Sequence, residues 1–190
     1  RPGNLCGMSS PFTKSDSAFH TLLRQQIRHE FTASQQYIAL AVYFDSGRLP
    51  QLARRFYAQA TDERRHAMMM VQYLLDRDLP VEVTGLDNVT ATFESVQAAV
   101  AHALDMEKQV TGQITALSRS ARETGDYLGE QFMQWFLQEQ VNEVARMTTL
   151  LTVIERAAGN TFDIEEFVAR ESTGPGSAGA AAPKAAGGGV

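Results

Sequence analysis

The stretch Asp62-Glu63-Arg64-Arg65-His66 stands in the middle of a long segment with helical periodicity. Glu63 and His66 are three residues apart, so on an α-helix they lie on one face, about one turn apart. Positions three and four apart through this segment form one stripe: Leu49, Leu52, Phe56, Gln59, Glu63, His66, Met70 and Tyr73. Because the stripe is mostly apolar, we expect it to face a core. A glutamate in a core is rare unless it is paired or binds a metal, so Glu63 needs a partner elsewhere in the chain.

The composition is typical of a folded, soluble protein of one domain. The 190 residues are 44% hydrophobic and 21% charged, and this length suffices for a sizeable core. A net charge of -5 argues against nucleic acid as a partner and favours attraction of cations. The single cysteine, Cys6, excludes an intrachain disulfide and a thiolate zinc site. The sequence has neither a secretory signal nor an apolar run long enough to cross a membrane, so we expect a cytoplasmic protein with no membrane partner.

Glycine, proline and serine divide the chain into a helical domain with two flanking segments. Residues 1–15 show no periodicity and are expected to form a flexible arm, and residues 172–190, rich in alanine, glycine and proline, a disordered tail. We expect residues 16–171 to form one domain of helices. The first helix is expected to begin after a cap among residues 15–17 and to end near residue 46, and the second and third to span about 50–76 and about 92–123. The fourth is expected to begin after a cap at Asp126 and to end near residue 157, and a short fifth helix to run from 161 or 163 to about 170.

The connections between these helices predict the topology. Residues 47–49 form a short link, which implies that the first two helices are antiparallel neighbours. Residues 77–91 contain Pro80 and Gly85 and are long for a link between helices, and such links in bundles usually cross from one end to the other. The predicted fold class is therefore all-α: a four-helix bundle with a long crossover between its second and third helices, and a short fifth helix.

Polar residues fall on the core-facing stripe of every long helix, close to its midpoint. In chain order they are Glu30, Glu63, His66, Glu107, Gln140 and Glu143. Midpoints of antiparallel helices share one layer, so these side chains can meet. Four buried carboxylates cannot all ionise without compensation, because like charges repel and desolvation is costly. Two divalent cations would cancel this charge, and a donor set rich in oxygen, with one imidazole and no sulfur, suits iron or manganese.

Three segments that carry five of these six residues, all but Glu107, resemble ferritins, most closely the non-haem ferritins of actinobacteria such as mycobacteria. The segments are HEFTASQQY at 29–37, DERRHAMMM at 62–70 and GEQFMQWFLQEQVNEVA at 129–145. The resemblance covers about residues 16–170 and implies a ferritin-like fold assembled as a hollow cage of 24 subunits. It further implies ferroxidase activity, in which O2 or H2O2 oxidises Fe(II), and storage of the product as ferric oxyhydroxide.

The resemblance also assigns roles to individual residues. The residues that match the ferroxidase centre are Glu30, Glu63, His66, Glu107 and Gln140, and Glu143 matches a further carboxylate of bacterial members. Tyr37 matches the tyrosine near the di-iron site and Trp135 a neighbouring tryptophan, although aromatics at helical spacing are more often packing residues. Asp62 and Glu139 match acids of a third iron site, but could be ordinary solvated acids, and Asn142 replaces a usual glutamate there.

Several positions depart from the family pattern or leave alternatives open. Arg64 stands where bacterioferritins have the haem-ligating methionine, so no haem is expected. At the threefold pore, Glu130 matches one family acid and Met133 replaces another. The tail is either a plain linker or, as in some actinobacterial ferritins, a signal for loading into a protein shell. His20 has no partner pattern and is expected at the surface.

Two other functions stay open: a di-iron oxidase or peroxidase of the rubrerythrin type that stores nothing, and a helical assembly protein with no enzymatic activity.

Overall fold

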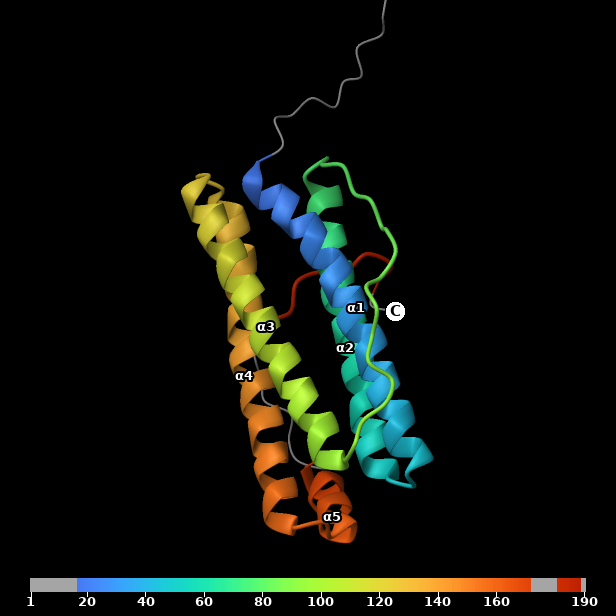
Figure 1. Ribbon diagram of the computed structural model, residues 1–190. Helices are drawn as coiled ribbons and strands as arrows, with labels where there is room; N and C mark the ends of the chain where they lie inside the picture. Colours follow the sequence, from blue (N-terminus) through green and yellow to red (C-terminus); the bar gives the residue numbers. More distant parts are fainter. Residues whose placement is uncertain (1–16, 172–180, 189–190) are drawn as a thin grey trace, which may run out of the picture.

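The computed structural model describes residues 17–171 and 181–188, and within these residues it contains five helices and no strand. Helices α1 (Ala18–Ser46), α2 (Pro50–Asp76), α3 (Val96–Glu123) and α4 (Tyr127–Ala157) pack lengthwise, and α5 (Thr161–Glu171) lies at one end of them (Figure 1). α1 and α4 run in one direction and α2 and α3 in the other. The predicted all-α four-helix bundle with a short fifth helix is confirmed.

The link between α2 and α3 runs along α1 from one end of the bundle to the other (Figure 1). Arg24 Nε donates to the Pro80 carbonyl at 2.8 Å, near the start of both segments. Farther along, the Gln36 side chain donates to the Thr90 carbonyl and accepts from the Thr90 amide, each at 2.7 Å. These contacts satisfy backbone groups that an extended segment would otherwise leave unpaired. The link therefore carries the chain across the bundle, and α3 begins parallel to α2.

Side-chain caps determine where the long helices begin. Ser17 Oγ accepts from the His20 amide at 3.2 Å, and Asp126 Oδ1 accepts from the Gly129 amide at 2.9 Å, as expected for these caps. α3 begins at Val96 and not near residue 92, because Ser95 Oγ accepts from the Ala98 amide at 3.0 Å. The preceding Phe93 is outside the helix and packs edge-on against Tyr43, with ring centroids 5.3 Å apart.

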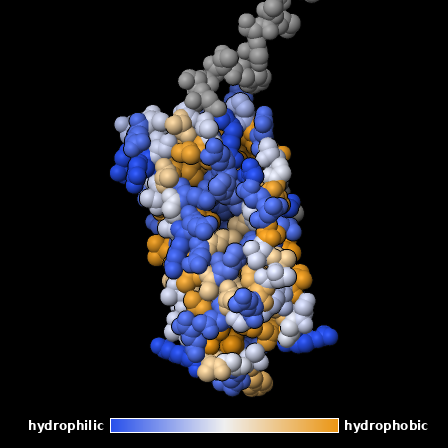
Figure 2. All heavy atoms as spheres, viewed as in Figure 1, coloured by the Kyte–Doolittle hydropathy of each residue, from blue (hydrophilic) through white to orange (hydrophobic). Residues whose placement is uncertain are grey.

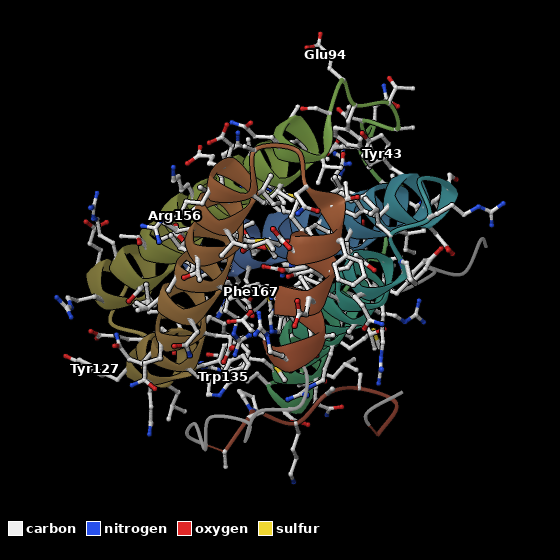
Figure 3. The ribbon with its side chains drawn as sticks, turned by 90° about the horizontal axis from the view of Figure 1, so that it is seen from below. Tyr43, Glu94, Tyr127, Trp135, Arg156 and Phe167 are labelled. Carbon is white, nitrogen blue, oxygen red and sulfur yellow. The ribbon has the colours of Figure 1, made fainter. Side chains whose placement is uncertain are left out.

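α2 has no side-chain cap of its own, and α5 supplies one. Leu49 precedes α2 and makes no capping hydrogen bond. The carboxylate of Glu165 on α5 instead accepts from the amides of Gln51, at 2.8 Å, and Leu52, at 2.9 Å. A carboxylate is favourable at a helix N-terminus because it meets the unpaired N–H groups and the positive end of the dipole. Phe167 of α5 packs against the bundle core at the same end. Figure 3 shows the bundle from this end, with Phe167 labelled.

A second polar cluster ties three helices together at the opposite end. The Asp126 carboxylate accepts hydrogen bonds from His20 Nε2 of α1, at 3.1 Å, and from Arg77 Nη1, just after α2, at 2.8 Å. Burial raises the pKa of Asp126, but the hydrogen bonds from Arg77, the Gly129 amide and His20 outweigh it and lower the pKa below its usual value. The prediction that His20 lies at the surface is wrong, since this ring is buried between α1 and α4.

The buried apolar side chains form two clusters, one towards each end of the bundle. On α1, the cluster near α5 uses residues 37–44 and the other uses residues 19–27, and the other long helices divide in the same way. Between the clusters lies a layer of buried polar side chains near the helix midpoints. On the outside, polar and charged side chains cover much of the face seen in Figure 2, with apolar ones between them. None of the described helices is long and apolar enough to cross a membrane.

Residues 181–188 lie against α2. The Ala186 amide donates to the Met68 carbonyl at 3.0 Å, and Ala185 and Ala186 pack against the apolar cluster distant from α5. The low-complexity composition did not predict this contact, because alanines have no helical or strand periodicity here. The predicted flexible arm, residues 1–15, and the rest of the predicted tail, 172–180 and 189–190, lie outside the described residues.

Candidate metal centre

The mid-bundle polar layer contains all six residues that the helical stripes predicted. Each of the four long helices contributes at least one of them, and each residue is at least nine-tenths buried. Their exposed fractions are 1% for Glu30, 2% for Glu63, 6% for His66, 1% for Glu107, 4% for Gln140 and 2% for Glu143. Four carboxyl groups and an imidazole are thus enclosed between two apolar clusters.

Glu30, Glu63 and His66 form a compact group with the geometry of a metal site. One potential ligand atom from each lies within 4.8 Å of those of the other two. His66 Nδ1 is 3.2 Å from Glu63 Oε2 on the same helix and 3.9 Å from Glu30 Oε2 on α1. Two carboxylates and one imidazole form a donor set that suits a divalent first-row metal.

The remaining three residues have protein partners of their own. The Tyr37 hydroxyl donates to Glu107 Oε1, and Gln140 Nε2 donates to Glu107 Oε2 at 3.3 Å. Arg146 Nη1 forms an ion pair with Glu143 Oε1 at 2.9 Å. Glu107 and Glu143 therefore lie beside the compact group but outside it.

Two carboxylate oxygens in this layer are buried without a hydrogen-bond partner: Glu30 Oε2 and Glu143 Oε2. Burying a polar atom without a partner costs free energy, and nearly all such atoms in folded proteins are paired. These two belong to residues on different helices, α1 and α4. Cations bound in this layer would give both oxygens a partner, which fits the donor set described above.

Burial and mutual repulsion control the protonation of the carboxyl groups. Burial, assisted by the charge of Glu63, raises the pKa of Glu30 to about 8 and that of Glu143 to about 7, and raises the pKa of Glu107 well above its usual value. Burial alone would raise the pKa of Glu63, but the hydrogen bond and charge of His66 lower it. In return, burial would lower the pKa of His66, but the hydrogen bond and charge of Glu63 raise it to about 9. Without a cation, Glu63 and His66 form an ion pair, and the carboxyls of Glu30 and Glu107 beside them are largely protonated at neutral pH.

Two aromatic residues that the sequence singled out contact the layer. Tyr37 is fully buried, and burial together with the charges of Glu107 and Glu63 raises its pKa well above 10. Trp135 is on α4 (labelled in Figure 3). Its ring lies edge-on to His66, with ring centroids 5.6 Å apart. Both residues touch the candidate ligands, so their packing role is established, and a redox role stays a prediction.

The predicted third iron site lies at the margin of the layer. Asp62 is exposed and Glu139 half-buried. Partial desolvation of the Asp62 carboxyl, with the charges of Glu63 and Glu139, raises its pKa, which indicates that these acids are neighbours. Glu139 is also 4.0 Å from Arg146, and Asn142 is exposed. Metal binding at Asp62 and Glu139 therefore stays a prediction.

The sequence did not predict three side chains that contact the candidate ligands. Arg146 neutralises Glu143, Gln26 Nε2 donates to Glu30 Oε1 at 2.8 Å, and Gln59 Nε2 donates to Glu63 Oε1 at 2.7 Å. The available signal was spacing, because each glutamine stands four residues before a glutamate and therefore on the same face of the helix.

Comparison with known proteins places this geometry in a family. The sequence model of the ferritin family, described as a ferritin-like domain, matches residues 20–157. The chain belongs to the ferritin family. It is 61% identical to ferritin BfrB of Mycolicibacterium smegmatis over 173 residues, which span 91% of this chain and 95% of that protein. It is 58% identical to bacterioferritin BfrB of Mycobacterium tuberculosis over 171 residues, 90% of this chain and 93% of that protein. The predicted resemblance to mycobacterial ferritins is confirmed.

More distant relatives share the fold. The bacterial non-heme ferritin of Staphylococcus aureus is 33% identical over 134 residues, 70% of this chain and 81% of that protein. An open pore ferritin from the archaeon Archaeoglobus fulgidus superposes with a TM-score of 0.78 at 25% identity, covering 83% of this chain and 97% of the archaeal one. The ferritin fold is thus shared over 83% of this chain.

Proposed function

We propose that this ferritin is an iron-storage protein with ferroxidase activity. It oxidises Fe(II) to Fe(III) at a di-iron centre within each subunit and stores the product as ferric oxyhydroxide inside a cage of 24 subunits. The observation that supports this most strongly is the pair of buried, unpartnered carboxylate oxygens on Glu30 and Glu143, in a layer that also contains Glu63, His66 and Glu107.

In this proposal the six residues divide between two Fe(II) ions. Glu30, Glu63 and His66 hold the first ion, because their ligand atoms already lie within 4.8 Å of one another. Glu107 and Glu143 hold the second, Glu63 bridges the two, and Gln140 donates a hydrogen bond to Glu107. Glu143 Oε2 is available to the second ion while Arg146 pairs with Oε1, and His66 must lose its proton to hold the first ion.

The substrates and the protein divide the chemistry between them. Each Fe(II) gives up one electron, and the two electrons with two protons convert O2 to H2O2 or H2O2 to two waters. The protein places the two ions side by side and compensates their charge with carboxylates. His66 is the nitrogen ligand of the proposed donor set, and the other ligands bind through oxygen. Fe(III) can exchange these oxygen ligands for those of the mineral when it leaves the centre.

The surface supports self-assembly. Exposed apolar side chains stand at the start of α4, where Tyr127 and Leu128 are 78% and 64% exposed, and on α5, where Phe162 is 75% exposed. Apolar side chains gathered at helix ends are suited to contacts between subunits. At the proposed threefold pore, Glu130 is bound by Arg122, with two nitrogens at 2.8 and 2.5 Å. We place the cage in the cytoplasm, and a protein shell that binds the C-terminal tail stays a prediction.

The test adds Fe(II) in air, at well over two ions per subunit, to the full-length protein and to the double variant Glu63→Ala, His66→Ala. Ferric absorbance reports oxidation, and gel filtration reports iron retained by a particle of 24 chains of 20.9 kDa each. The matched control is Asp105→Ala, Lys108→Ala, which removes an exposed acid–base pair of the same three-residue spacing on α3.

The outcomes distinguish the candidate functions. Fast oxidation with far more than two irons retained per subunit, lost in the site variant and kept in the control, would support a storage ferritin. Oxidation that stops at two irons per subunit in a small particle would indicate an oxidase that stores nothing. Equal oxidation by the site variant and the parent would overturn the site assignment and favour a purely structural polar layer.

A further inference from the structure

We propose that Gln26 and Gln59 are positioning residues of the metal centre, which select the carboxylate oxygen that each of two glutamates presents to iron. The inference rests on the proposed function, because it concerns how the same centre is held. Both glutamines are buried, at 3% and 7% exposure, and each donates a hydrogen bond to a glutamate in the group of potential metal ligands.

At the first position, Gln26 engages one oxygen of Glu30 and leaves the other bare. Gln26 Nε2 donates to Glu30 Oε1 at 2.8 Å. Glu30 Oε2 has no hydrogen-bond partner and is 3.9 Å from His66 Nδ1, inside the compact group. The hydrogen bond therefore fixes the rotation of the carboxylate so that the unpartnered oxygen faces the position of the cation.

Gln59 repeats this arrangement on α2. Its Nε2 donates to Glu63 Oε1 at 2.7 Å, and Glu63 Oε2 is the oxygen 3.2 Å from His66 Nδ1. Each glutamine lies four residues before its glutamate, so the helix itself holds donor and acceptor on one face. Two ligands on different helices thus have the same internal support, with the Oε2 atoms of both converging on His66.

A third helix, α3, fixes the orientation of the Gln26 side-chain amide. Gln26 Nε2 also donates to Gln113 Oε1 of α3 at 3.1 Å. An amide NH2 has two hydrogens, and both now have acceptors, so turning the amide over would lose two hydrogen bonds. Gln113 in turn lines an open pocket of about 270 Å³ between α1 and α3, together with His29 and Gln109. The amide that orients Glu30 is therefore anchored from the outer side of the layer.

A pair on α2 outside the polar layer, with Gln72 half-buried and Asp76 exposed, offers a matched control. Gln72 Nε2 donates to Asp76 Oδ1 at 2.5 Å, again four residues apart, and neither residue belongs to the polar layer. A glutamine that merely stabilises its helix by such a hydrogen bond would behave as Gln72 does. A positioning glutamine would also change how the glutamate binds metal, because partners that orient ligands typically affect metal affinity about 10- to 100-fold.

The experiment titrates the assembled, metal-free parent and the variants Gln26→Leu, Gln59→Leu and Gln72→Leu with Co²⁺ under nitrogen. The visible d–d absorption bands report both the dissociation constant and the coordination geometry. We expect the dissociation constant to rise about tenfold or more in the first two variants, with altered band intensities, and to stay within about twofold of the parent in Gln72→Leu.

The outcomes separate this inference from the proposed function. If the parent binds Co²⁺ and the Gln26 and Gln59 variants bind it with unchanged affinity and bands, the inference is overturned and the metal centre stands, even if the variants melt at lower temperature. If the parent binds no Co²⁺, the proposed function fails and the inference with it. Should Gln26→Leu not assemble, Gln113→Leu removes only the anchor of the amide. We expect it to raise the dissociation constant about threefold, and an unchanged value would overturn the role of Gln26.

Discussion

Binding of divalent cations to the mid-bundle layer should release protons, and the structure sets their number. A metal ligand must be deprotonated, whereas burial and the charge of Glu63 raise the pKa of Glu30 to about 8 and that of Glu143 to about 7. The ion pair with Glu63 raises the pKa of His66 to about 9. Metal must therefore displace protons from all three groups at neutral pH.

The magnitude follows from these three pKa values. At pH 7 about nine-tenths of the Glu30 carboxyls, about half of the Glu143 carboxyls and nearly all His66 rings carry a proton. Filling the centre should then release at least about two protons per subunit. At pH 9 most of these protons have already dissociated, so the release should fall by nearly two and the apparent metal affinity should rise with pH over this interval.

Calorimetry can measure this release. Co²⁺ is titrated into the metal-free protein under nitrogen in buffers of different ionisation enthalpy, at pH 7 and at pH 9, and the slope of heat against buffer enthalpy gives the protons released. The double variant Glu63→Ala, His66→Ala serves as the control for binding elsewhere. A release below one proton per subunit at pH 7, or the same release at both pH values, would refute the assignment of these protonation states.

Three further predictions concern stability and can be checked by thermal or denaturant unfolding. Gly129→Ala should destabilise the fold by about 1–3 kcal/mol, because its Cβ would lie 2.4 Å from a ring carbon of the buried Phe19; Gly112→Ala on α3 meets nothing within 4 Å and should cause no loss. Glu165→Ala should cost about 1–2 kcal/mol and speed hydrogen exchange of the Gln51 and Leu52 amides, because it removes the cap of α2. Unchanged exchange of these amides would contradict this cap. Because the pKa of Asp126 is lowered, its contribution to stability is complete above the usual pKa of 3.8 and is lost as the pH falls below that value. Asp126→Asn should therefore unfold more easily than the parent at neutral pH but lose less stability on acidification. An equally steep loss of stability with falling pH in the variant and the parent would count against the role of this cluster.

The amino-acid sequence by itself determined the helices, the bundle and the composition of the central layer. Alternating spacings of three and four place Glu30, Glu63, Glu107 and Glu143 on core-facing stripes, because an α-helix has 3.6 residues per turn. Each stripe carries its polar residues near the midpoint, so any antiparallel packing of the helices brings them into one layer. These properties are local to each helix, and the structure confirms the fold class that follows from them.

Only the tertiary structure decided which groups pair within and around that layer. Spacing places Gln26 on the face of Glu30 and Arg146 on the face of Glu143, but it does not determine which carboxylate oxygen each of them binds. In the same way, His20 is buried where Asp126, the cap of the distant helix α4, comes within 3.1 Å of its ring. Burial and pairing depend on side chains that other elements bring close, and sequence periodicity describes only the face on which a residue lies.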